Sequence, residues 1–94
     1  MIRSYRNKDI QALFEGGKRV KGRPSDVQRR IVLKLQMLHA AENLDDLKIP
    51  PGNRLEPLRG DRKGQHSIRI NNQYRICFIW RDGDAYEVEV VDYH

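Results

Sequence analysis

Three side chains that can transfer protons follow one another at the C-terminal end of the sequence. Asp92, Tyr93 and His94 supply a carboxylate, a phenol and an imidazole. Histidine titrates at about pH 6.5 in model peptides, so it can exchange protons at neutral pH, and a neighbouring carboxylate orients it. Residues at a chain end usually fray. These three residues, the terminal triplet, therefore indicate either acid/base chemistry or a frayed tail, and spacing leaves both open.

A cation that could serve the same chemistry lies earlier in the sequence, at Arg75. Cleavage of RNA without a metal needs a base for the ribose 2′-hydroxyl, a cation for the charge on the phosphorane, and an acid for the leaving 5′-oxygen. The terminal triplet could provide the acid and the base, and Arg75 the cation. This combination suggests acid/base chemistry on a phosphate polyanion.

Positive charge gathers in two other segments that could bind the same polyanion. Segment 58–64 places three cations between or beside two glycines, which suits a tight exposed loop. It lacks the length and the Lys-Ser/Thr ending of a P-loop, and a charged, solvated turn explains it equally well. Segment 18–24 is a basic connector containing glycine and proline. The cations of the two segments are Arg59, Arg62 and Lys63, and Lys18, Arg19, Lys21 and Arg23.

The composition is that of a small, basic, globular protein. The 94 residues are 38% hydrophobic and 33% charged, with a net charge of +5. Twelve of the 18 cationic residues are arginine, whose planar guanidinium suits phosphate oxygens. The length predicts one domain spanning residues 1–94. A basic domain attracts nucleic acid through counterion release whatever its chemistry.

Several classes of protein are not expected. The sequence lacks the roughly 18 consecutive apolar residues of a membrane span and the apolar stretch of a secretory signal, so we expect no membrane association. Cys77 is the single cysteine and reads as a small hydrophobe within a strand, which suits a reducing cytosol. The three histidines have no ligand-type spacing, so we expect neither a metal nor another cofactor.

Two helices should form the first half of the chain. Apolar residues at helical spacing predict a short helix between Asn7, its N-cap, and Gly16-Gly17. A longer helix should begin at Ser25, which has a capping-box pattern with Gln28, and everything helical should end near Lys48, before two prolines. The apolar stripe of the longer helix comprises Val27, Ile31, Leu35 and Leu38, broadened by Val32 and Leu44.

After the two prolines the apolar period changes to 2, which predicts strands. The predicted strands span 67–71, 74–80 and 85–91, with turns at 71–73 and 82–84 and further short strands at 1–6 and 53–58. The expected fold is α+β, with two N-terminal helices packed on one face of a small, mainly antiparallel β-sheet.

Keeping one face of this sheet apolar fixes the strand register. Three-residue loops place Ile68 opposite Ile76, Phe78 opposite Val88 and Ile76 opposite Val90. Two-residue loops would set Phe78 opposite Glu87 and mix the faces. The sequence therefore favours three-residue loops at both turns.

The same register has consequences for three polar residues. It places His66 on the apolar face opposite Phe78, which indicates packing. It also places Arg69 opposite Arg75, a like-charge pair that is destabilising unless an anion lies nearby. Either Glu89, diagonal to Arg75, or a bound phosphate could supply that anion, and register does not separate them.

Taken together, these segments resemble HigB-type toxins of the RelE/ParE superfamily, the toxin halves of bacterial toxin–antitoxin pairs. The resemblance covers nearly the whole chain and rests on four segments in order: 58–64, Ser67–Asn71 with Tyr74–Phe78, Asp82–Tyr86 and the terminal triplet. It implies a RelE-like fold and an endoribonuclease that enters the ribosomal A site and cuts translated mRNA, leaving a 2′,3′-cyclic phosphate. It also implies contact with ribosomal RNA, a helix-turn-helix, HigA-like antitoxin as partner, and action in the cytoplasm.

The resemblance also suggests roles for individual residues. His94, with Asp92 and Tyr93, falls on the acid/base positions, and Arg75 on the phosphate-stabilising position. Arg59 falls where such toxins often carry a lysine, so its electrostatic role transfers, and Glu56 falls where some relatives place a histidine. The residues expected to contact RNA or phosphate are Arg59, Arg62, Lys63, Arg69, Lys18, Arg19, Lys21 and Arg23.

Two other functions fit parts of the sequence. A toxin of the same fold that inhibits DNA gyrase by protein–protein contact would need neither His94 nor Arg75. A nucleic-acid-binding module without enzymatic activity is favoured by charge alone.

Overall fold

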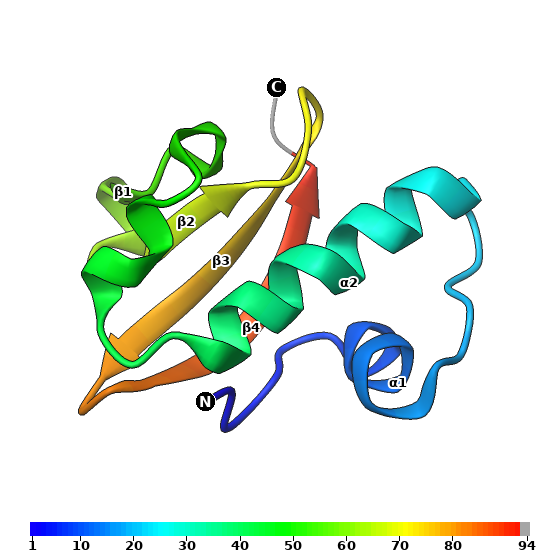
Figure 1. The fold of residues 1–94 in the computed structure, drawn as a ribbon, viewed down its shortest axis with the longest axis horizontal. Helices are drawn as coiled ribbons and strands as arrows, with labels where there is room; N and C mark the ends of the chain where they lie inside the picture. The colour runs from blue at the N-terminus through cyan, green and yellow to red at the C-terminus, as the bar shows by residue number, and fades with distance from the viewer. Residues whose placement is uncertain (93–94) are drawn as a thin grey trace.

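Helices cover one face of a four-stranded sheet in the computed structural model, which describes residues 1–92 (Figure 1). The helices are α1 (Lys8–Gly16) and α2 (Ser25–Ala40), and the strands are β1 (Glu56–Pro57), β2 (His66–Arg69), β3 (Tyr74–Arg81) and β4 (Asp84–Asp92). The strands lie in the order β1-β2-β3-β4, and each pair is antiparallel. The predicted α+β architecture is confirmed. None of the helices in the described chain is both long and apolar enough to cross a membrane.

The core lies between the helices and the sheet. Its fully buried side chains come from both layers: Ile10, Ile31, Leu35, Leu38, Ile68, Ile76, Phe78 and Val88. Burying one such side chain contributes roughly 1.5–3 kcal/mol. The helix α2 ends earlier than predicted, at Ala40, and Leu44 instead begins a short 3-10 helix, η1 (Leu44–Lys48). A second 3-10 turn, η2 (Pro51–Asn53), follows before β1.

The predicted capping box of Ser25 and Gln28 is absent. Pro24 occupies the N-cap position of α2. The Gln28 amide instead accepts from the Val20 N–H (2.9 Å) and donates to the Val20 carbonyl (3.0 Å) and the Arg23 carbonyl (2.6 Å). These buried backbone groups need partners, and Gln28 supplies them at the expense of the cap. The basic connector is thereby tied to the first turn of α2.

The register between β2 and β3 is as predicted, whereas the β3–β4 hairpin differs. A two-residue loop, Asp82-Gly83, joins these strands, and its φ values of 53° and 81° are those of a type I′ turn. A bulge then corrects the register, because Glu87, at φ 52°, and its neighbour Val88 both lie across from Phe78. Ile76 consequently still faces Val90, as predicted. The apolar face is preserved by a bulge rather than by a longer loop.

The N-terminal segment lies beside β4. Ile2 and Tyr5 form isolated parallel bridges with Ala85 and Val88, in place of the short first strand that was predicted. The Oδ1 atom of Asn7, at the N-cap of α1, accepts a hydrogen bond from the Val90 N–H (3.1 Å). The outer edge of β4 is therefore covered by the chain itself, as is usual for edge strands.

Candidate phosphate-binding site

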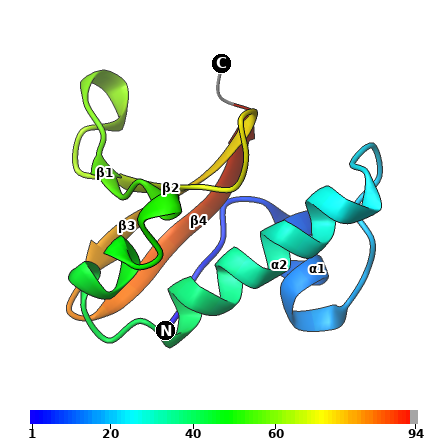
Figure 2. The ribbon, with the colours of Figure 1, turned by 45° about the horizontal axis from the view of Figure 1, so that its top comes forward.

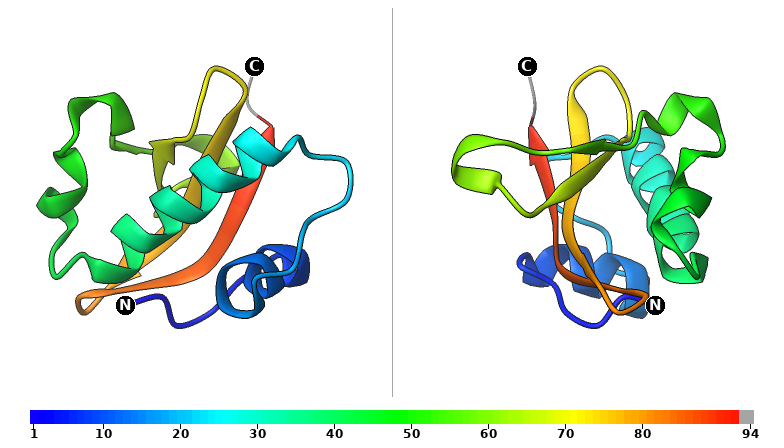
Figure 3. Two further views of the ribbon diagram at one scale, coloured as in Figure 1. Left: turned by 45° about the vertical axis from the view of Figure 1, so that its right-hand side comes forward. Right: turned by 90° about the vertical axis from the view of Figure 1, so that its left-hand side faces the viewer.

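The face of the sheet turned away from α2 carries the candidate site. Successive side chains on a strand point to opposite faces, so Arg75, Cys77 and Glu89 lie on the face opposite to Ile76 and Phe78. The connection between β1 and β2 passes over this face, and it includes the 3-10 turn η3 (Gly60–Arg62). Figure 2 shows this connection projecting beyond β1, and the right-hand view of Figure 3 shows it on the side opposite to α2.

Arg75 is held by several partners although it lies on a strand. Its Nε donates to the Ser67 hydroxyl (2.8 Å) and its Nη2 to the Arg54 carbonyl (2.7 Å), while a Glu56 carboxylate oxygen lies 3.6 Å from Nη2. Only 8% of Arg75 is exposed. A buried guanidinium requires such partners, and they fix the plane of its fork. These contacts give the Arg75 guanidinium a defined orientation.

A cleft of about 480 Å³ lies next to this cation. It is lined by Glu56, Pro57, Leu58 and Arg59. Glu56 is one of the lining residues, and its carboxylate lies 3.6 Å from Arg75, so the guanidinium is a neighbour of the cleft wall. The cleft is therefore flanked by Arg75 and Arg59, which could hold a phosphodiester.

Glu89 does not compensate Arg75, contrary to one of the two explanations offered by the register. Glu89 instead contacts Arg62 (3.1 Å) and Arg6 (3.5 Å), because the β1–β2 connection folds back over the sheet and brings Arg62 to it. The carboxylate near Arg75 is instead that of Glu56, from β1. The Glu56 carboxylate offsets the charge of Arg75 in the opposed pair, and the Arg69 guanidinium donates to the neutral Asn72 side chain.

The terminal triplet is only partly described. Asp92 pairs with Tyr74, one residue out of phase with Arg75, so its side chain starts from the helix-side face. Its carboxylate accepts a hydrogen bond from the Gln73 amide (3.1 Å). Tyr93 and His94 lie outside the described residues. The approach of His94 to Arg75 therefore stays a prediction.

The remaining cations divide between the two sides of the sheet. The side chains of Arg59 and Lys63 are exposed on the β1–β2 connection. The connector lies in the helix layer, where the Arg23 guanidinium stands over the Tyr74 ring at 5.3 Å and lies 4.0 Å from the Asp9 carboxylate. Lys18 and Lys21 are exposed there, and Arg19 bonds to the Ser25 hydroxyl.

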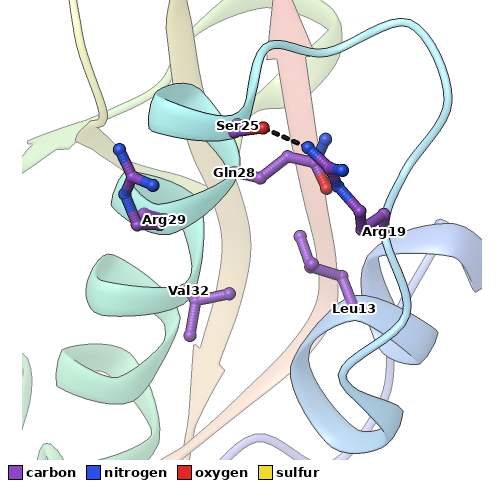
Figure 4. Close-up of a pocket in the computed structure, with 6 residues that line it drawn as sticks. All are labelled: Leu13, Arg19, Ser25, Gln28, Arg29 and Val32. Atoms are coloured by element: carbon purple, nitrogen blue, oxygen red, sulfur yellow. Dashed lines mark hydrogen bonds between the residues drawn. The ribbon is translucent and has the colours of Figure 1, made fainter.

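A groove of about 420 Å³ also lies in the helix layer, and it was not anticipated from the sequence (Figure 4). Its lining residues are Leu13, Arg19, Ser25, Gln28, Arg29 and Val32. It is separate from the Arg75 network, which lies on the other face of the sheet.

The remaining histidine and cysteine candidates behave as packing residues. His66 stacks on Phe78 with ring centroids 6.3 Å apart, which confirms the packing interpretation, and burial lowers the pKa of its imidazole. Cys77 is fully buried, and burial raises the pKa of its thiol, so the reactive thiolate is disfavoured. Within residues 1–92, His, Cys, Asp and Glu side chains do not gather in groups of three or more that could hold a metal ion.

Sequence reasoning missed four residues around Arg75. Ser67 could have been found, because the predicted register puts it on the same face as Arg75, beside Cys77. Arg54 acts through its carbonyl, and its neighbour Asn53 accepts a hydrogen bond from Lys34 of α2. Backbone acceptors and loop conformations leave no residue-type signal in a sequence.

The two-layer α+β arrangement of this chain recurs in solved structures of other proteins. The fold is shared with YafQ from E. coli (TM-score 0.60, 11% identity, covering 98% of this chain and 93% of that chain). It is also shared with a chain of the YoeB-YefM complex from Staphylococcus aureus (TM-score 0.57, 14% identity, covering 100% of this chain and 98% of that chain). At these identities the likeness concerns the fold alone.

Sequence comparison identifies the family. The model of the HigB-like toxins, described as RelE-like toxins of the type II toxin-antitoxin system HigB, matches residues 3–94. Toxin HigB-1 of Vibrio cholerae is 44% identical over 85 residues, covering 90% of each chain. Endoribonuclease HigB of Proteus vulgaris is 37% identical over 94 residues, covering 100% of each chain. The chain belongs to the HigB family of RelE-like toxins, as its resemblance suggested, and its partner is an antitoxin.

Proposed function

We propose that this toxin is an endoribonuclease that cuts translated mRNA in the ribosomal A site without a metal ion. The observation that carries the proposal is the buried Arg75 guanidinium, oriented by Ser67 and the Arg54 carbonyl beside a cleft. Support also comes from the Proteus vulgaris relative, which is named as an endoribonuclease and aligns with the whole chain. Its action on ribosomes places the toxin in the cytoplasm, and its antitoxin is a helix-turn-helix, HigA-like protein.

The proposed cleavage is an intramolecular transesterification at the phosphodiester. A base removes the proton of the 2′-hydroxyl, and the 2′-oxygen attacks the adjacent phosphorus. The bond from phosphorus to the 5′-oxygen breaks, and an acid protonates that oxygen. The products are a 2′,3′-cyclic phosphate and a 5′-hydroxyl, and no water is consumed. Arg75 stabilises the negative charge of the phosphorane, where preorganised charge-assisted hydrogen bonds are most effective.

The proton transfers fall to the terminal triplet. His94 is the leading acid/base, Asp92 is its partner or the alternative base, and Tyr93 stacks on a base of the message or donates a proton. Arg59 contacts the scissile phosphate as a fixed charge. The other cations contact messenger or ribosomal RNA: Arg62, Lys63, Arg69, Lys18, Arg19, Lys21 and Arg23.

Primer extension on a translated message tests the proposal. Cuts should appear only with ribosomes, be unchanged when the toxin is treated with EDTA and dialysed before the assay, and disappear with His94→Ala. An intact message in the presence of ribosomes, together with loss of supercoiling in a gyrase assay, would show that this toxin instead acts on gyrase.

The variant Arg75→Lys tests the cation. Lysine keeps the charge but lacks the planar fork that reaches the Ser67 hydroxyl through Nε and the Arg54 carbonyl through Nη2. Cleavage should fall about 100-fold with ribosome affinity unchanged, while the lost buried hydrogen bonds lower stability by about 1–2 kcal/mol. Arg81→Lys is the matched control, because Arg81 is exposed at the far end of β3, over the Tyr86 ring. Wild-type cleavage by Arg75→Lys would contradict the assignment.

A further inference from the structure

The backbone that holds Arg75 has an unusual conformation. Arg54 lies in the left-handed region, at φ 45° and ψ 54°, although it is not glycine. Its carbonyl is the 2.7 Å acceptor for the Arg75 Nη2. Such conformations persist only where the surroundings over-determine them, and they concentrate at functional sites. The question is what imposes this conformation on Arg54.

The preceding residue, Asn53, ties this segment to the helix layer. Asn53 is fully buried, and its Oδ1 accepts from the Lys34 ammonium of α2 at 2.6 Å. Its Nδ2 donates to the Leu47 carbonyl (3.2 Å) and the Ile49 carbonyl (3.4 Å). One side chain therefore fixes both the loop before β1 and its distance from α2.

Lys34 is an uncommon residue for such a position. It is 8% exposed, and burial together with the nearby charges of Arg30 and Arg69 lowers the pKa of its ammonium group. Burying an ammonium group is costly, and a neutral side chain of similar volume would avoid that cost. The bond to Asn53 is the contact that accounts for an ammonium group here.

The loop connects the two faces of the sheet. The turn η2 lies against β2, and the chain continues from it through Arg54 into the edge strand β1. Arg75 is thus held from two directions. Ser67 on β2 accepts from its Nε, and α2 acts on its Nη2 through Lys34, Asn53 and the Arg54 carbonyl.

We propose that Lys34 and Asn53 are positioning residues, which fix the Arg54 carbonyl and through it orient the Arg75 guanidinium toward the scissile phosphate. The inference deepens the proposed ribonuclease function and rests on it. It makes the helix layer, on the other face of the sheet, part of the support of the catalytic cation.

A matched pair at position 54 tests the backbone link. Arg54→Gly and Arg54→Val remove the same exposed charge, but glycine adopts positive φ readily and valine does not. The kcat of ribosome-dependent cleavage should be about 10- to 100-fold lower for Arg54→Val than for Arg54→Gly, at equal KM. Equal kcat values for the two folded variants would overturn the proposal.

A second pair tests the link to α2. Lys34→Met removes the ammonium group at similar volume, and Arg30→Met removes an exposed cation one turn earlier on the same helix. Lys34→Met should lower kcat about tenfold at unchanged KM, whereas Arg30→Met should stay within about twofold of wild type. Thermal unfolding by circular dichroism checks that both variants fold. Equal kcat in these folded variants would count against the proposal.

The NMR signal of the Arg75 Nε–H provides a readout that needs no RNA. It is assigned in ¹⁵N-labelled toxin by its loss in Arg75→Lys. The signal should shift and exchange faster with solvent in Lys34→Met and Arg54→Val, and stay unchanged in Arg30→Met. An unperturbed signal in the first two variants overturns the positioning role. A perturbed signal in a toxin whose wild type leaves mRNA intact supports the positioning of Arg75 and refutes the ribonuclease function.

Discussion

At the scale of single residues, His66 shows what burial does to a polar ring. Its Nδ1 is buried without a hydrogen-bond partner in the described structure, and the ring stacks on Phe78. Burial lowers the pKa of His66, so the unfolded chain takes up its proton at a higher pH than the folded protein. Above the ordinary pKa of histidine, His66 is neutral in both the folded and the unfolded state, so its protonation does not affect stability. As the pH falls below that value, protonation of the unfolded chain progressively destabilises the fold.

The variant His66→Phe should remove this dependence. It replaces an unpaired buried nitrogen by carbon in an aromatic contact, so stability should rise by about 1 kcal/mol at pH 7. The gain should be larger at pH 5, because only the wild type loses stability by protonating His66 in the unfolded state. Urea unfolding at the two pH values measures both differences. A gain that does not grow at pH 5 would contradict this account of His66.

At the scale of elements, Gln28 links the connector to α2. Its amide makes three hydrogen bonds to connector backbone, whereas Ser25 at the helix start makes no capping bond. Gln28→Ala would leave buried backbone groups unpaired and should cost about 2–3 kcal/mol of unfolding free energy. Ser25→Ala should cost less than about 0.5 kcal/mol, since no cap is lost. Chemical denaturation measures the unfolding free energy of both variants. A larger loss for Ser25→Ala than for Gln28→Ala would show that Ser25 does cap the helix.

The elements also show how far sequence reasoning reaches. Apolar periodicity was sufficient for both helices and for the facing of Ile76 and Val90, because one buried face leaves few registers. It did not anticipate the bulge at Glu87, since no glycine marks the positive φ there. A two-residue turn and a bulge together give the same facing as a three-residue turn. Apolar periodicity therefore constrains the combined number of residues in the turn and the bulge, but not how they divide between the two.

The site was predictable only where it depends on strand alternation. Arg75 opposite Arg69 follows from register, and so does their need for compensation. Of the two anions that register left open for Arg75, Glu89 is not the one used, because the path of the β1–β2 connection decides which carboxylate reaches which guanidinium. That path depends on long-range packing and on turns such as the one at Arg54, which cannot be predicted from the residue types.

At the scale of the whole molecule, positive charge lies on both sides of the sheet. Arg59 and Lys63 are exposed on the connection over the Arg75 face, whereas Lys18 and Lys21 are exposed in the connector of the helix layer. A short strand of RNA in the cleft would not touch both sides. A ribosomal site that surrounds the toxin would, so the charge distribution fits the proposed target better than free RNA.

The double variant with Lys18→Ala and Lys21→Ala tests this interpretation. Removing two cations lowers the net charge from +5 to +3. If the connector contacts ribosomal RNA, ribosome binding should weaken and the slope of log affinity against log salt should decrease by roughly 1.5, at about 0.7–0.9 per released counterion. Binding of a short single-stranded RNA should stay unchanged, because the connector lies across the sheet from the cleft. Lys63→Ala, a single cation beside the cleft, should instead weaken binding of both ligands. If the double variant weakened the short RNA as much as the ribosome, the connector would belong to the message-binding surface, and the two-sided contact would be wrong.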